Sequence, residues 1–204
     1  MYNSSKEIAL AMTGASGISY GLRLLECLLK AGITVHLMIS RAAYTVVAME
    51  TDLRLPSRSK DLQRYLANYF SVALELIHCY SENQWTSPLA SGSHCIPTMI
   101  VCPCTVGAIS AIARGANDNL IERAADVMIK EQRKLILVPR ETPFSAIHLE
   151  NMLTLARLGT VVLPANPGFY HQPQHIGELI DYIVARILDH AEIPHQLLAR
   201  WGEN

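Results

Sequence analysis

Short apolar runs and longer amphipathic runs alternate along the chain. Five nearly continuous apolar runs of strand length, rich in Val, Ile, Leu and Met, occupy 7–13, 33–39, 98–104, 134–139 and 160–165. Such runs are typical of parallel strands that are buried on both faces. Helical patterns occupy 18–31, 41–50, 105–114, 119–133, 145–158 and about 175–191. The alternation predicts an α/β fold: a doubly wound, Rossmann- or flavodoxin-like, mainly parallel sheet with helices on both faces.

The stretch 51–97 is less regular. It contains a predicted helix at 59–70, a possible strand around 74–80 and the loop-like segment WTSPLASGSHCIP. No internal repeat and no linker divides the chain, so we predict one domain over 1–204. We expect the tail, about 192–204, to lie at a subunit interface or over the active site.

Composition narrows the function classes. Half of the residues are hydrophobic and 17% are charged, which predicts that much surface is buried between subunits. The formal net charge of -1 argues against a nucleic-acid binder, which needs a basic field. The longest apolar stretch, TMIVCPCTVGAISAIA, contains Pro103 and polar residues and is too short to span a bilayer.

The five cysteines do not show a metal or redox spacing. Cys102 and Cys104 form Cys-Pro-Cys inside an apolar run, without the C-x-x-C pattern of zinc or thioredoxin sites. Free, buried thiols are therefore expected. Together with the lack of a signal-peptide pattern at the start, they predict a cytoplasmic protein.

Small and charged polar residues follow the predicted strands. Open α/β sheets bind ligands outside the carboxyl ends of their strands, where the strand order reverses. The residues at these ends are Thr13-Gly14-Ala15-Ser16-Gly17, Ser40-Arg41, Thr105-Val106-Gly107-Ala108, Arg140-Glu141-Thr142-Pro143 and Asn166-Pro167-Gly168-Phe169-Tyr170-His171. Together they predict an anion-binding site along one edge of the sheet.

The first of these loops, in AMTGASGISYG, does not fit a dinucleotide. Its glycines are spaced G-x-x-G-x-x-x-G rather than G-x-G-x-x-G, and the T-G-x-x-x-G-x-G loop of short-chain dehydrogenases does not match either. The second strand ends in Ser40-Arg41, without a carboxylate for a ribose hydroxyl. A helix N-terminus that presents free amides to a single phosphate remains compatible. Alternatively, the glycines serve only close packing of strand and helix.

Several motifs in chain order resemble one family. They are TGASGISYGLRLLECL, ISRAA, Glu50-Thr51-Asp52, ASGS at 90–93, LIERAADVMIKE at 120–131, VPRETPFSAIHLENM at 138–152, PGFYHQPQ at 167–174 and the terminal Arg200-Trp201. This set is similar to UbiX-type flavin prenyltransferases of the flavin-binding cysteine-decarboxylase superfamily. A relative that decarboxylates a cysteine thioether would carry P-x-M-N after the strand at 134–139, where this chain has PRETP.

The resemblance implies an enzyme that binds reduced FMN and transfers the dimethylallyl group of dimethylallyl phosphate to N5 and then C6 of the flavin. The product, prenylated FMN, would serve a UbiD-type decarboxylase. The resemblance also implies a homododecamer and a reaction without metal, and the chain has no D-D-x-x-D run.

The resemblance assigns roles by position. It implies FMN contacts from Gly14, Ala15, Ser16, Ser40, Ser91, Thr105, Val106, Gly107, Ala108, Arg123 and Arg140. It implies substrate contacts from Lys130, Arg140, Tyr170, Arg186 and Trp201. Its candidate catalytic residues are Glu141, Glu50, Ser16 and Lys130. Two positions depart from the family's P-C-S-x-x-T loop, since Thr105 replaces Ser and Ala108 replaces Thr.

Structural interpretations remain open beside these roles. Ser16 and Ser40 would also suit helix N-caps, Glu141 could be the ion-pair partner of Arg140, and Trp201 could be a packing residue. Two other functions also remain: a flavin-dependent decarboxylase of the same superfamily, and a non-catalytic FMN carrier.

Overall fold

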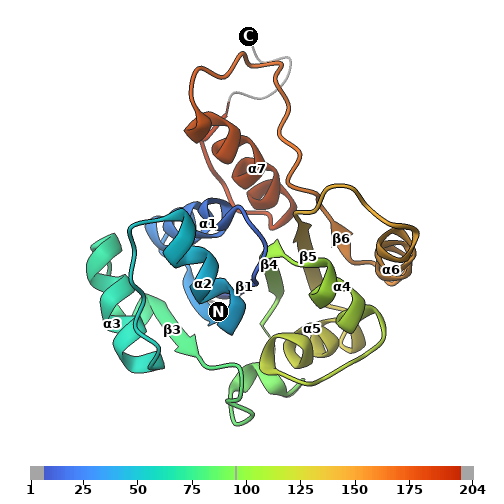
Figure 1. Ribbon diagram of the computed structural model, residues 1–204. Coiled ribbons are helices and arrows are strands. Elements are labelled where there is room, and N and C mark those ends of the chain that lie inside the picture. Colours follow the sequence, from blue (N-terminus) through green and yellow to red (C-terminus); the bar gives the residue numbers. More distant parts are fainter. Residues whose placement is uncertain (1–6, 95, 199–204) are drawn as a thin grey trace.

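One parallel sheet forms the centre of the molecule (Figure 1). The computed structural model describes residues 7–94 and 96–198. Within them six strands pair in the order β3-β2-β1-β4-β5-β6. The strands are β1 (Glu7–Met12), β2 (Thr34–Ile39), β3 (Ile77–Tyr80), β4 (Thr98–Cys104), β5 (Lys134–Pro139) and β6 (Val161–Val162). Every pairing is parallel, and the order reverses between β1 and β4.

Helices cover both faces of the sheet (Figure 1). The apolar side chains of one face pack against α1 (Ile18–Lys30), α2 (Arg41–Glu50), α3 (Ser59–Phe70) and α7 (Ile176–His190). The other face packs against α4 (Val106–Ala113), α5 (Leu120–Lys130) and α6 (Ala146–Arg157). Two short 3-10 helices, η1 (Leu74–Leu76) and η2 (Pro88–Ala90), lie in the connections on either side of β3. This arrangement confirms the predicted α/β class.

The sheet is held by apolar residues on both faces. All seven residues of β4 are buried, and Leu10 of β1 lies in register between Leu37 of β2 and Ile100 of β4. Alternate residues of one strand serve opposite faces, so Ala9 and Ala11 join the second core while Leu10 joins the first. This two-sided burial explains why the strands appear in the sequence as nearly continuous apolar runs.

The last strand is shorter than predicted. The apolar run 160–165 contains only the two strand residues of β6, although the amides of Leu163 and Ala165 still donate to Leu137 and Pro139 of β5 at 2.9 and 3.0 Å. In a regular parallel ladder the carbonyl of Leu163 would accept from the amide of residue 139, but Pro139 at the end of β5 has no N–H to donate.

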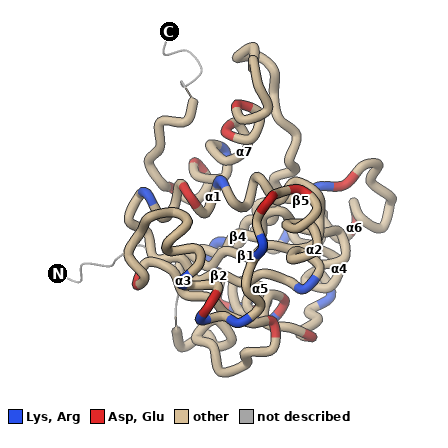
Figure 2. The backbone as a smooth tube through the Cα atoms, turned by 60° about the vertical axis from the view of Figure 1, so that its left-hand side comes forward, with Lys and Arg blue, Asp and Glu red and all other residues tan. Residues whose placement is uncertain are grey.

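Apolar side chains also remain on the surface. On α6, Ile147, Leu149 and Leu153 are 66%, 53% and 50% exposed, and Phe169 in the loop before α7 is 67% exposed. Charged residues of both signs are interspersed along the chain (Figure 2). None of the described helices has the length and apolar character needed to cross a membrane.

Candidate active site

The loops after β1 and β4 meet where the strand order reverses. Thr13, directly after β1, is buried, and its hydroxyl donates to the carbonyl of Pro103 at 2.9 Å. The same hydroxyl oxygen accepts a hydrogen bond from the amide of Thr105 at 2.8 Å. One side chain therefore fixes the loop of residues 13–17 to the loop that begins α4. Such a switch point is where doubly wound sheets bind ligands.

Glu50, the last residue of α2, occupies the N-terminus of α1. Its carboxylate accepts hydrogen bonds from the amides of Gly17 and Ile18 at 2.9 and 3.0 Å. Gly17, the N-cap, has φ +96°, a left-handed conformation that favours glycine. Helix N-termini attract negative charge, so this contact stabilises α1.

The same contacts set the charge of Glu50. Burial by itself would raise the pKa of this carboxyl group, but the hydrogen bonds from the Ser16 hydroxyl and from the two amides outweigh it. The nearby Arg140 acts in the same direction, so the pKa of Glu50 lies below its ordinary value. Glu50 is therefore ionised at neutral pH, with Ser16 hydrogen-bonded to it.

This contact bears on the two interpretations of the first loop that the sequence left open. Free amides at the N-terminus of α1 were compatible with binding a single phosphate, but those of Gly17 and Ile18 already donate to Glu50. Gly14 also has a packing role, because a Cβ there would lie 2.4 Å from the Cβ of Ala42 in α2. Amides that remain open to an anion at this edge of the sheet belong to another helix.

This helix is α4, whose N-terminus lies at the same edge of the sheet. The Thr105 side chain caps it by accepting from the amide of Ala108 at 3.1 Å. Among the described residues, no partner accepts from the amides of Val106 and Gly107. These two donors, at the positive end of the helix dipole, lie at the switch point.

The neighbouring α2 offers less room for an anion. Ser40 is its N-cap and accepts from the amide of Ala43 at 3.1 Å, as the structural interpretation anticipated. The amide of Arg41 donates to a carboxylate oxygen of Glu82 at 3.1 Å. A second carboxylate thus already lies at this helix N-terminus.

Arg140 joins the two loops with a fixed positive charge. Its amide lies 3.4 Å from the carbonyl of Cys104, and its Nε donates to the carbonyl of Ser16 at 3.1 Å. The half-buried ring of Tyr20 lies beside Gly17 and near this arginine. Burial raises the pKa of the Tyr20 hydroxyl, a neighbouring buried thiol adds to this, and Arg140 opposes it. Sequence reasoning missed Tyr20, since nothing local marks a tyrosine in a helix as facing a site.

Glu141 follows Arg140 but is not its ion-pair partner here. Its carboxylate accepts from the amide of Thr142 at 3.0 Å. The alternative that Glu141 only neutralises Arg140 therefore has no support from the described contacts.

A second group of candidate residues lies along α5. Arg123 donates to the carbonyl of Ala90 at 3.0 Å and pairs with Asp126 at 3.0 Å. Ser91 follows directly, and its hydroxyl lies 2.9 Å from that of Ser93. The segment 90–92 thus runs along α5, with Gly92 against Glu131.

Lys130 lies at the wrong end of the sheet for the switch-point loops of its own chain. It ends α5 and pairs with Glu131, a few residues before β5 begins at Lys134, whereas Arg140 directly follows the last residue of β5. At about 3.3 Å per residue, the six-residue strand separates its two ends by about 17 Å.

Two further candidates belong to the α7 region, outside both groups. Tyr170 is 83% exposed in the loop before α7, where the neighbouring His171 stacks on Tyr182 with ring centroids 5.6 Å apart. Arg186 on α7 pairs with Asp189 at 2.7 Å and is half exposed. Trp201 lies outside the described residues.

The described cysteines are free thiols, as expected. Burial raises the pKa of Cys79 to about 12 and shifts the pKa of Cys102 and Cys104 still further upward. All three therefore stay protonated and poorly nucleophilic at neutral pH.

Known proteins resemble the chain over nearly its whole length. The Flavoprotein family model matches residues 2–188. The flavin prenyltransferase UbiX of Pseudomonas aeruginosa is 55% identical over 198 residues, covering 97% of this chain and 95% of the relative. The flavin prenyltransferase UbiX of Halalkalibacterium halodurans is 44% identical, covering 95% of this chain and 92% of the relative.

Solved structures agree with these relatives. AnUbiX, crystallised in complex with FMN and dimethylallyl pyrophosphate, superimposes with a TM-score of 0.85 at 37% identity, covering 97% of both chains. A protein described as a dodecameric FMN-dependent UbiX-like decarboxylase from Escherichia coli O157:H7 gives 0.83 at 36% identity, covering 96% of this chain and 98% of the other. The described fold and the extent of these matches lead to one assignment: the chain belongs to the UbiX flavin prenyltransferases of the Flavoprotein family.

Proposed function

We propose that the protein transfers the dimethylallyl group of dimethylallyl phosphate to reduced FMN, giving prenylated FMN for a UbiD-type decarboxylase. The observation that carries the proposal is the 55% identity to a flavin prenyltransferase over 97% of the chain. The switch-point loops add a cation, hydroxyls and open amides at one edge of the sheet.

The FMN phosphate would bind at the N-terminus of α4. The amides of Val106 and Gly107 are the open donors there, and Glu50 and Glu82 already fill the corresponding positions at α1 and α2. Ala108 brings no hydroxyl where the family has Thr, so these backbone amides would carry more of the binding. The loop of Gly14, Ala15 and Ser16 would then contact the flavin, with Ser40 beside it.

Ser16 and Glu50 would move a proton. Prenyl transfer breaks the allylic C–O bond, phosphate leaves with the electron pair, and the freed carbon bonds to N5, which gives up its proton. Protonation of the remaining C=C bond then allows its tertiary carbon to bond to C6, which loses its proton in turn. An ionised Glu50 hydrogen-bonded to Ser16 is a base that can accept that proton through the hydroxyl. Glu141 would protonate the leaving phosphate, and Arg140 would stabilise its charge.

The remaining phosphate ligands would come from other copies of the chain. Lys130 comes before the start of β5 and Arg140 after its end, and these two ends of the strand lie about 17 Å apart. Tyr170 and Arg186 lie on the α7 side. The dodecameric relative and the exposed apolar row on α6 support a homododecamer that assembles these groups around one substrate. Arg123 on α5 and Ser91 in the segment that runs along it would complete the FMN site in the same way.

An anaerobic assay tests the proposal. Purified protein is incubated with reduced FMN and dimethylallyl phosphate, and the extracted flavin is analysed by mass spectrometry. We expect a flavin heavier by one five-carbon prenyl unit, without added metal, and its loss in Arg186→Ala. Unmodified flavin from a protein that binds FMN would contradict prenyl transfer. Release of CO₂ from a cysteinyl peptide would then favour the decarboxylase, and no turnover of either would favour the carrier.

A further inference from the structure

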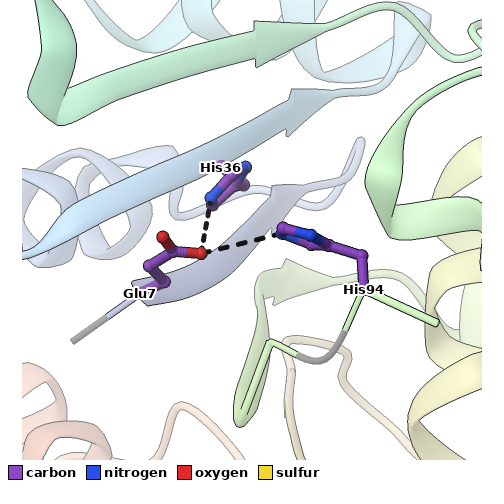
Figure 3. A group of neighbouring side chains, drawn as sticks. All are labelled: Glu7, His36 and His94. Carbon is purple, nitrogen blue, oxygen red and sulfur yellow. Dashed lines mark hydrogen bonds and ion pairs between the residues drawn. The ribbon is translucent and has the colours of Figure 1, made fainter. Parts of the chain in front are cut away.

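Three potential metal ligands meet at the opposite edge of the sheet from the switch-point loops. Glu7 begins β1, His36 lies on β2, and His94 lies in the segment that leads into β4 (Figure 3). The parallel register pairs Ala9 with His36, so Glu7 and His36 are diagonal neighbours on one face of the sheet. Both histidine rings point toward the Glu7 carboxylate.

The distances suit a small metal ion. Glu7 Oε2 lies 3.3 Å from His36 Nε2 and 3.8 Å from His94 Nε2, and the three ligand atoms all lie within 4.8 Å of one another. Ligands at zinc-like bond lengths around a tetrahedral ion lie about 3.3 Å apart. Glu7 and His36 already have this separation. His94 must move closer by about 1 Å to close the set, and its side chain is 48% exposed on an irregular segment.

A supporting contact fixes His36 for this role. Its Nδ1 lies 3.0 Å from the hydroxyl of Tyr80 on the neighbouring strand β3, which leaves Nε2 directed at Glu7. Metal-binding histidines typically use the second ring nitrogen for such an outer contact, which sets the tautomer. The His36 side chain is only 7% exposed, so its ring is held by packing as well.

We propose that Glu7, His36 and His94 bind one divalent transition-metal ion, of which Zn²⁺ is the best fit. Two imidazoles and one carboxylate favour this class over Mg²⁺ or Ca²⁺, which prefer all-oxygen sites. The ion would tie the segment before β4 to β1 and β2. The site is separate from the residues proposed for prenyl transfer, and it departs from the expectation that the chain holds no metal.

Metal titration of the full-length, tag-free protein tests the site. The protein is stripped with a chelator, and Co²⁺ and Zn²⁺ are added while visible d–d absorption and thermal unfolding are followed. We expect one ion per chain, a Co²⁺ spectrum of low coordination number, and a rise in unfolding temperature, because a ligand that binds the folded state stabilises it.

Variants separate this site from adventitious binding at surface histidines. His94→Ala removes an exposed ligand with little risk to folding, Glu7→Gln removes the charge, and His190→Ala alters an exposed histidine at the end of α7 as the control. We expect His94→Ala and Glu7→Gln to weaken Zn²⁺ binding by at least tenfold, while His190→Ala binds as wild type does. Equal affinity in His94→Ala and His190→Ala, or no binding by the wild type, would overturn the proposal.

Discussion

The carboxylate of Glu50 lies 2.9 Å from the amide of Gly17, although 33 residues separate the two in sequence. The contact joins the end of α2 to the beginning of α1 and fixes the loop that carries Ser16. It also makes Glu50 an ionised group whose removal has both structural and chemical consequences.

Glu50→Gln should lower stability in a pH-dependent way. The pKa of Glu50 is lowered in the folded protein, so its contribution is present above the ordinary glutamate pKa and disappears as pH falls through the folded value. We expect a loss of about 0.5–1 kcal/mol at pH 7, the size of an exposed helix-terminal charge effect. Thermal unfolding at pH 7 and near pH 3 would measure it. Glu75→Gln, on an exposed turn, is the control; a penalty that persists unchanged at low pH would contradict the assignment.

Val106→Pro should weaken FMN binding without unfolding α4. Val106 is the first residue of that helix, where proline is tolerated, and Thr105 already has the extended conformation that proline requires of its predecessor. Proline removes one amide proposed to bind the phosphate, so affinity should fall about tenfold or more. Fluorescence titration with FMN would measure this against Val106→Ala. Equal affinities of the two variants would place the phosphate elsewhere.

Two inactive variants should complement each other. Lys130→Ala and Arg140→Ala remove groups from opposite ends of β5, which the proposed function brings together only between subunits. Co-expressed variants that mix randomly would then restore about one quarter of the sites. Prenyl transfer by isolated mixed oligomers is the measurement, with each variant alone as the baseline. Activity no higher than the baseline would show that both groups act within one chain or that Lys130 is not required.

The apolar row on α6 should be needed for assembly. Leu149 and Leu153 are one helical turn apart and half exposed, and burying a new charge between subunits is costly. Leu153→Glu should therefore shift the protein to smaller species in light scattering, while Asn68→Glu on the exposed side of α3 leaves its mass unchanged. An intact large oligomer in Leu153→Glu would move the interface to another surface.

Local patterns in the sequence predicted the fold well because most of the strands are buried on both faces and the helices α1, α3, α5 and α7 are amphipathic. The order of the strands could be inferred only as a class, and the length of β6 was overestimated because apolar character does not reveal that Pro139 on the neighbouring strand lacks a ladder donor. The edge of the sheet where the loops meet could also be predicted from the sequence, since polar residues follow β1, β4 and β5 directly.

The contacts between residues inside the site could not be predicted from the sequence. No local pattern shows that Glu50 fills the amides at α1, nor that Glu7, His36 and His94 converge from three separate segments. The helical spacing of Arg123 and Lys130 correctly suggested one helix but could not show that Lys130 lies away from Arg140. These relationships arise from tertiary packing and, in the last case, point beyond a single chain.

The hydroxyl of Thr13 has a further consequence for ligand binding. As donor to Pro103 and acceptor from Thr105, this one oxygen atom sets the spacing between the loop of residues 13–17 and the loop that begins α4. A ligand that spans both loops then loses little free energy to ordering the protein. The spacing of the two loops is thus set by the protein itself, and Thr13→Val, which keeps the shape of the side chain but removes the hydroxyl, would leave that spacing to be ordered when a ligand binds.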